Sequence, residues 1–186
     1  LFLTASLWLF FDMTEGRSKA KYFIFTACYT AAILTKETAV LLMPVFIFYL
    51  LWRKYRLNKD VSQSDFLCAG IYPAAITAAI YLLAAGSASN VFSVIKIIIS
   101  SPATNEYVIS YCSGPWTRYI VDFFVISPLV LLLAAAFFIR YFFLKQKDGK
   151  ITYFIISAII YFVLLNFFAK NIRYAMLLDT PMRLFA

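Results

Sequence analysis

The sequence contains no histidine and only nine acidic residues among its 186. The absence of histidine excludes a Ser-His-Asp triad and a histidine-ligated metal within this chain. Its three cysteines, Cys28, Cys68 and Cys112, are unevenly placed and form neither a metal-binding spacing nor a disulfide framework. We therefore expect no metal site and no cofactor in this stretch.

Charge is scarce as well, because 14% of the residues are charged and 63% are hydrophobic. A soluble domain averages about a quarter charged and about half apolar residues. The apolar residues here fall in long runs that one soluble core could not bury, whereas a lipid bilayer suits them. We expect an all-α, polytopic integral membrane protein built as a multi-helix transmembrane bundle, with the lipid bilayer as its first partner.

The net charge of +8 does not indicate nucleic acid, because the basic residues do not form a basic face on a folded domain. They gather instead in three short clusters between apolar runs, as cytoplasmic turns do. The segments between these clusters, including Lys36 and the 86–117 loop, are then expected on the non-cytoplasmic side. The three clusters are Arg17, Lys19 and Lys21; Arg53, Lys54, Arg56 and Lys59; and Arg140, Lys145, Lys147 and Lys150.

The apolar runs predict spans near residues 1–11 (partial), 22–35, 38–52, 66–85, 119–143 and 151–168, with the start of another at 181. The outer loop contains an apolar segment, 91–99, around Lys96, which predicts a helix lying in the membrane interface. The chain begins inside one apolar run and stops as another helix begins. We therefore interpret it as a single transmembrane region, internal to a longer protein.

Both ends of the hairpin 22–52 are basic and are therefore expected on the cytoplasmic side. The hairpin must then enter the membrane and return to the side from which it came. Each arm has about fourteen residues, or roughly 22 Å of helix, against a hydrocarbon core of roughly 30 Å. Its tip, Lys36 and Glu37, is therefore expected below the outer membrane surface. Charges at that depth are tolerated only against protein or water, and they mark candidate sites. Alternatively, the two residues neutralise each other at a tight turn, with Lys36 reaching outward.

Further polar residues are expected on the same outer side. Arg118 and Asp122 lie four residues apart and share a helix face, either as an interfacial ion pair or as part of a cavity wall. Asn105 and Glu106 are polar residues of the outer loop. Glu106 is its only carboxylate, hence its one local candidate for a general base, although most loop acids are simply solvated.

The outer return near the end of the chain is basic. Lys170, Arg173 and Tyr174 lie there, against the usual cytoplasmic bias of positive charge. Such a group is suited to an anion, since arginine recognises phosphate with several donors and lysine acts as a point charge. The alternative is ordinary contact with lipid headgroups.

Three segments together resemble the type-C glycosyltransferases, which include protein O-mannosyltransferases and the lipid A aminoarabinose transferase. The segment 34–39, Leu-Thr-Lys-Glu-Thr-Ala, resembles their Leu-Thr-Lys-Glu motif. The junction 114–119, Gly-Pro-Trp-Thr-Arg-Tyr, looks like the loop-to-helix junction of bacterial members. Asn171-Ile172-Arg173-Tyr174 is similar to their Arg-Tyr segment, although Asp179 and Thr180 precede Pro181 where the family often has Leu-Pro.

The resemblance implies an enzyme that moves a sugar from a polyprenyl-phosphate-linked donor to a glycan, lipid or protein acceptor on the non-cytoplasmic face. It implies that the catalytic Asp lies near the amino terminus of such enzymes, outside this chain. Lys36 matches the family lysine near the lipid phosphate, with Glu37, Arg173 and Tyr174 as further donor-binding residues. The cavity wall would include Asn105, Arg118, Asp122 and Lys170.

The bacterial look of the junction favours a bacterial plasma membrane with a periplasmic site. Two other functions stay open at this point. A secondary transporter also has broken helices and charges at depth, and should carry a second copy of the hairpin. A non-catalytic membrane assembly subunit is the other alternative.

Overall fold

The computed structural model describes residues 1–104, 106, 110, 114–144, 148–167 and 182–183. The described residues form helices and no strand, which confirms the predicted all-α class for this part of the chain. In chain order the elements are α1 (Phe2–Glu15), α2 (Lys19–Thr35), the 3-10 helix η1 (Glu37–Leu41), α3 (Leu42–Arg56), α4 (Gln63–Phe66), the π-helical turn η2 (Leu67–Ile71), α5 (Tyr72–Ala85), α6 (Ala88–Thr104), α8 (Arg118–Ile126), α9 (Pro128–Phe143) and α10 (Gly149–Leu165).

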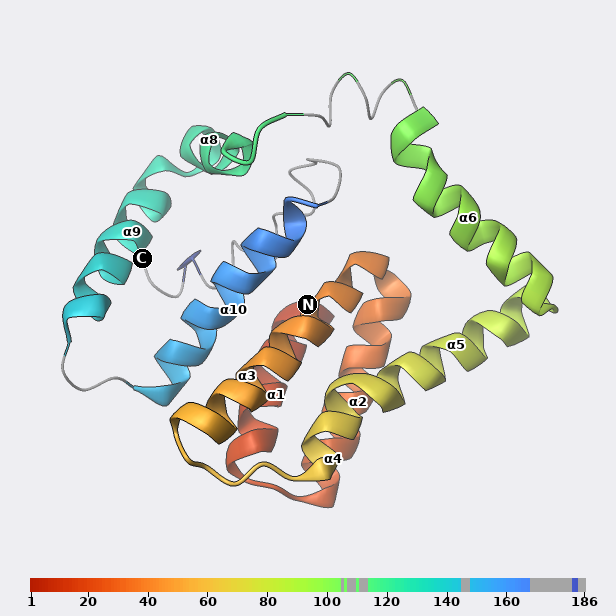
Figure 1. The fold of residues 1–186 in the computed structure, drawn as a ribbon, viewed down its shortest axis with the longest axis horizontal. Helices are drawn as coiled ribbons and strands as arrows, with labels where there is room; N and C mark the ends of the chain where they lie inside the picture. Colours follow the sequence, from red (N-terminus) through yellow and green to blue (C-terminus); the bar gives the residue numbers. More distant parts are fainter. Residues whose placement is uncertain (105, 107–109, 111–113, 145–147, 168–181, 184–186) are drawn as a thin grey trace.

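Aromatic rings fill the centre of the helical bundle. Helix α1 packs along α2, α2 along α5, and α3 along α10 (Figure 1). The Phe10 ring, fully buried, stacks on that of Phe46 with their centroids 4.2 Å apart. The Tyr153 ring of α10 meets the Tyr49 ring of α3 edge-on at 4.7 Å. Offset and edge-to-face pairs of this kind stabilise a core beyond their buried area.

Within the described residues, two helices are long and apolar enough to cross a membrane, Thr38–Arg56 and Gln63–Ala85. A third is present if the bent pair α8 and α9 is counted as one span. A helix needs about 20 apolar residues to cross the hydrocarbon core of a membrane. These helices support the predicted membrane association. The apolar helix α10 is shorter than that length, with 17 residues.

The predicted span 119–143 differs from the structure, which divides it into α8 and α9 with a bend of 119° between them. The reason is Pro128, which has no N–H and disfavours the helical conformation at the residue before it. Ser127 accordingly leaves the helical region, with φ −147° and ψ 67°. The first helix is also longer than predicted, since α1 continues through Asp12–Glu15, which the sequence pattern places in a turn.

From its contact with α2, α5 runs outward, and α6 turns back from it at Gly86, so that the two helices form a V (Figure 1). Gly86 has a φ of 71°, in the left-handed region that favours glycine. Apolar side chains on both arms are exposed, such as Leu83 at 83% and Phe92 at 71%. The helix expected over 91–99 is present as part of α6, which spans Ala88–Thr104. Its position relative to a membrane stays a prediction.

Candidate functional site: a broken hairpin tip and an ionic network at opposite ends of the bundle

The tip of the hairpin is a break in the helical backbone at Lys36. Helix α2 ends at Thr35, Lys36 is extended with φ −155° and ψ 112°, and η1 begins at Glu37. The Ala39 N–H donates to the Lys36 carbonyl over 2.9 Å. The hydroxyl of Tyr29, a fully buried residue, donates to the Ala39 carbonyl over 3.3 Å. The backbone on both sides of the break is thus fixed.

Helix α10 meets the hairpin at this tip. Tyr161 of α10 lies next to Thr38 of η1, and Tyr119 of α8 lies near Tyr161. Both tyrosines are buried, with 2% and 0% of their surface exposed. Lys36 itself is partly buried. A tyrosine of α10 therefore lies against η1, just after the break at Lys36.

The arms of the hairpin are longer than the sequence pattern indicates. Helix α2 begins at Lys19, capped by the Ser18 hydroxyl, and has 17 residues, or about 25 Å at about 1.5 Å per residue. It starts before the apolar run because the Ser18 hydroxyl accepts the Lys21 N–H and caps the helix there. With this longer arm, Lys36 would lie closer to the outer membrane surface than the sequence pattern indicates. Its depth in the membrane stays a prediction.

The remaining sequence candidates are distributed as follows. Arg118 and Asp122 form the expected i, i+4 ion pair in α8, with Nε and Oδ2 3.9 Å apart. Glu106 is exposed. The other four candidates, Asn105, Lys170, Arg173 and Tyr174, lie outside the described residues.

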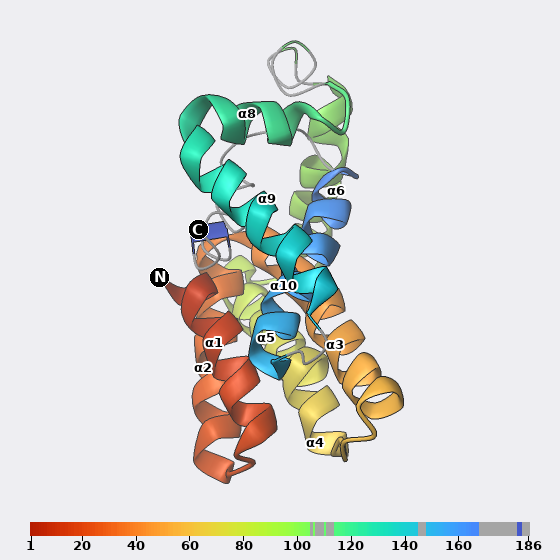
Figure 2. The ribbon, with the colours of Figure 1, turned by 90° about the vertical axis from the view of Figure 1, so that its left-hand side faces the viewer.

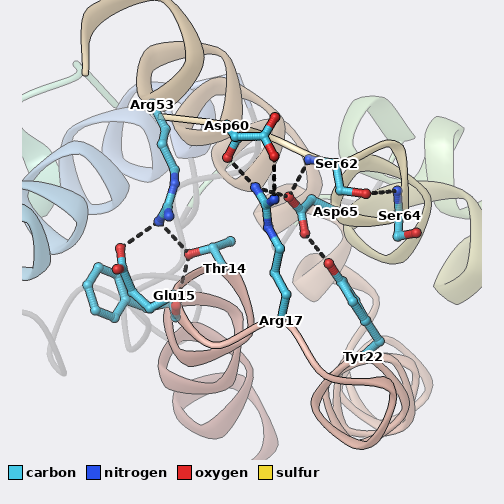
Figure 3. A network of polar contacts seen from close by, with 10 residues as sticks. Thr14, Glu15, Arg17, Tyr22, Arg53, Asp60, Ser62, Ser64 and Asp65 are labelled. Carbon is cyan, nitrogen blue, oxygen red and sulfur yellow. Dashed lines mark hydrogen bonds and ion pairs between the residues drawn. The ribbon is translucent and has the colours of Figure 1, made fainter. Parts of the chain in front are cut away.

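At the opposite end of the hairpin, the structure shows a polar network that sequence reasoning missed. It joins the turn between α1 and α2 to the end of α3 and the α3–α4 loop (Figure 3). We call it the inter-turn network; its members are Thr14, Glu15, Arg17, Tyr22, Arg53, Lys59, Asp60, Ser62 and Asp65.

One half of the network surrounds Arg53, which is 6% exposed. Its Nη1 donates to the Glu15 carboxylate over 2.6 Å and to the Thr14 hydroxyl over 3.1 Å. Lys59 Nζ lies 3.3 Å from the same carboxylate. A buried guanidinium is tolerated only when paired, so Glu15 is the group that permits Arg53 to be buried.

The other half surrounds Asp65, which is 1% exposed. Its carboxylate accepts the Tyr22 hydroxyl over 2.6 Å and the Ser62 N–H over 2.8 Å. The second of these completes a capping box that starts α4. Arg17 binds the exposed Asp60 at 2.7 Å and approaches Asp65 at 3.4 Å. The two turns are therefore tied together through a buried carboxylate and a buried guanidinium.

A sequence signal for this network exists. Four of the nine acidic residues, Asp12, Glu15, Asp60 and Asp65, lie within or beside the first two basic clusters. The third basic cluster is also attached to the bundle, because Lys150 Nζ lies 3.6 Å from the centre of the Trp8 ring. The basic turns are thus packed parts of the fold.

We predict that acid weakens this end of the bundle. Partial burial acts to raise the pKa of Glu15, but Arg53 and Lys59 outweigh it and hold that pKa below its ordinary 4.5. The hydrogen bond from Arg17 likewise holds the pKa of Asp60 below 3.8. Both carboxylates therefore contribute stability that is fully present above about pH 4.5 and is lost as pH falls through the folded-state pKa values.

The measurement is the unfolding midpoint of the protein in detergent micelles between pH 7 and pH 3, for the wild type and Glu15→Gln. The wild type should lose stability below about pH 4.5, and the variant should lose less over the same range. Parallel pH profiles would contradict the assignment.

Comparison with known proteins gave no matching family model, no matching curated protein and no matching solved structure.

Proposed function

We propose that this chain forms part of a polytopic membrane glycosyltransferase, which moves a sugar from a polyprenyl-phosphate-linked donor to an acceptor on the non-cytoplasmic face of a plasma membrane. The observation that carries the proposal is the break at Lys36. The lysine lies where α2 ends and η1 begins, at the end of the hairpin opposite the inter-turn network. Ionisable residues at helix breaks in membrane proteins mark binding sites for charged groups.

In the proposed reaction the lysine acts on the leaving group. The acceptor hydroxyl gives its proton to a carboxylate outside this chain and attacks the anomeric carbon of the sugar. The bond from that carbon to the phosphate oxygen breaks, and the phosphate takes the electron pair. The Lys36 ammonium stabilises the charge that develops on this oxygen, with Arg173 and Tyr174 proposed as further phosphate-facing groups.

The test is Lys36→Ala in the full-length protein. We expect transfer from undecaprenyl-phosphate-linked sugars to fall by at least about a hundredfold, as when one preorganised charge-stabilising donor is removed, and binding of undecaprenyl phosphate to weaken. Binding is measured with the purified protein in detergent and transfer with a panel of radiolabelled donors. Lys19→Ala is the matched control, because Lys19 is exposed at the other end of the same helix.

Membrane insertion and the unfolding midpoint should be unchanged in both variants. Normal lipid binding and transfer by a well-folded Lys36→Ala protein would refute the role of Lys36.

A secondary transporter is the second candidate, favoured by one observation. The bend of 119° between α8 and α9 is a second interruption of an apolar helical segment, and transporters bind substrates at discontinuous helices. Proteoliposomes containing the full-length protein would distinguish the two. A transporter accumulates solute without consuming a lipid-linked sugar, whereas the transferase releases polyprenyl phosphate without solute uptake.

A further inference from the structure

Helices α8, α9 and α10, together with Met182, line a partly open cavity of about 460 Å³. This volume lies within the range of roughly 300–1,000 Å³ that is usual for pockets holding small molecules. Every described side chain that lines it is hydrophobic, among them Ile120 and Phe123 of α8, Leu132 and Ala135 of α9, and Ala158 and Phe162 of α10. Figure 1 shows α8 and α9 arching beside α10.

The cavity follows from how the two flanking helices are joined. At the loop end, α9 and α10 are held together, because the Tyr141 hydroxyl lies 2.7 Å from the Thr152 hydroxyl and donates to the Asp148 carbonyl over 2.8 Å. At the other end, the bend after Ser127 turns α8 across the bundle (Figure 2). Between these fixed points the lining includes the small residues Ala135 and Ala158. Their side chains leave the space unfilled.

Water is a poor occupant of this space. A buried water molecule needs about two to four polar partners, and the lining side chains offer none. An empty cavity would cost the lining its dispersion contacts, since protein interiors are close-packed. An apolar occupant is therefore favoured.

The side of the cavity formed by α9 and α10 continues onto the outer surface of the bundle. Two lining residues are exposed, Leu132 at 58% and Ile159 at 50%. Next to them on α9, Leu129 and Ile139 are exposed at 67% and 62%. In a membrane, this surface faces the hydrocarbon tails of lipids. The cavity thus opens toward the acyl chains of the surrounding lipids.

We propose that the cavity between α8, α9 and α10 binds one acyl chain of a bilayer phospholipid, which enters from the side between α9 and α10. In hydrocarbon the lipid tails are as apolar as the lining, so shape and close contact hold the chain rather than expulsion of water. The bound lipid completes the packing of the bent pair. The inference rests on a membrane location and not on the proposed transferase function.

The test is photo-crosslinking of the purified full-length protein in vesicles of phosphatidylcholine that carries a diazirine in the middle of one acyl chain. In the wild type, mass spectrometry should find labelled residues on the cavity-facing side of α10, at Ala158 and Phe162. Ala135→Trp places a large ring in the space, and we expect it to reduce this labelling severalfold, because the ring takes up part of the volume that the acyl chain would occupy. The smaller Ala135→Leu should give an intermediate reduction.

Ala136→Trp is the matched control, because Ala136 is the next residue of α9, is exposed and does not line the cavity. Its α10 labelling should equal that of the wild type, and equal unfolding midpoints should show that the variants are folded. Equal α10 labelling in the wild type and both Ala135 variants would overturn the proposal. So would labelling confined to the outer residues Leu129 and Ile139, or a cavity crosslinked to another protein segment. Failure of sugar transfer by the wild type would leave this result unaffected.

Discussion

Replacing Tyr153 with alanine is expected to destabilise the protein by about 4 kcal/mol, the middle of the range for removing a large aromatic side chain from a core. Tyr153 is fully buried on α10. Its ring lies 5.9 Å from that of Phe10 on α1 and 4.7 Å from that of Tyr49 on α3. Its hydroxyl donates to the Leu7 carbonyl of α1 over 2.9 Å. One side chain therefore joins three helices that are far apart in the sequence.

The measurement is the free energy of unfolding in mixed micelles, from a denaturant titration followed by circular dichroism. Tyr153→Phe separates the two contributions, because it keeps the ring and removes only the hydrogen bond, for a cost of about 1 kcal/mol. Tyr55→Ala is the exposed control, since Tyr55 is 70% exposed, and it should change stability by less than about 0.5 kcal/mol. Equal losses for the alanine and phenylalanine variants of Tyr153 would show that the ring contacts contribute little.

The helices of this fold are largely predictable from sequence, because long apolar runs in a chain with few charges leave helices as the main option. Segment 66–85 lies within one 23-residue helix as expected. Segment 119–143 was the exception, although Pro128 was visible in it. A proline indicates a break or a kink, but it does not fix the angle between the two helices.

The candidate site was predictable only where the contact is local. The break at Lys36 and the pair Arg118–Asp122 involve residues at most four positions apart, and both are present. The inter-turn network joins residues such as Glu15 and Arg53, which are 38 positions apart. Nothing in the spacing of their sequence indicates which acid meets which base. The cavity beside α10 is harder still to predict, because it depends on small side chains, Ala135 and Ala158, where three helices come together.

Removal of the Glu15 carboxylate is expected to cost more than removal of its partner Arg53, although both changes break the same ion pair. The Glu15→Ala variant removes the carboxylate that pairs with Arg53, whose side chain is 7% exposed. The guanidinium then keeps its hydrogen bond to the neutral Thr14 hydroxyl. A buried charge left without its counter-ion costs about 3 kcal/mol. In Arg53→Met the carboxylate that remains is 40% exposed and still paired with Lys59, so water and lysine solvate it. We expect a loss of about 1 kcal/mol, mainly from the hydrogen bond to Thr14.

The same unfolding titration measures both variants and the double variant. Combining Glu15→Ala with Arg53→Met removes both charges, and its loss should be smaller than that of Glu15→Ala alone, because no unpaired buried charge remains. Lys59→Met is the matched control for the exposed part of the network; at 49% side-chain exposure it should change stability by less than about 0.5 kcal/mol. If Arg53→Met costs as much as Glu15→Ala, the stability of this end of the bundle comes from the packing of the arginine stem. If the order is as expected, Glu15 is the residue that allows α3 to end in a buried arginine.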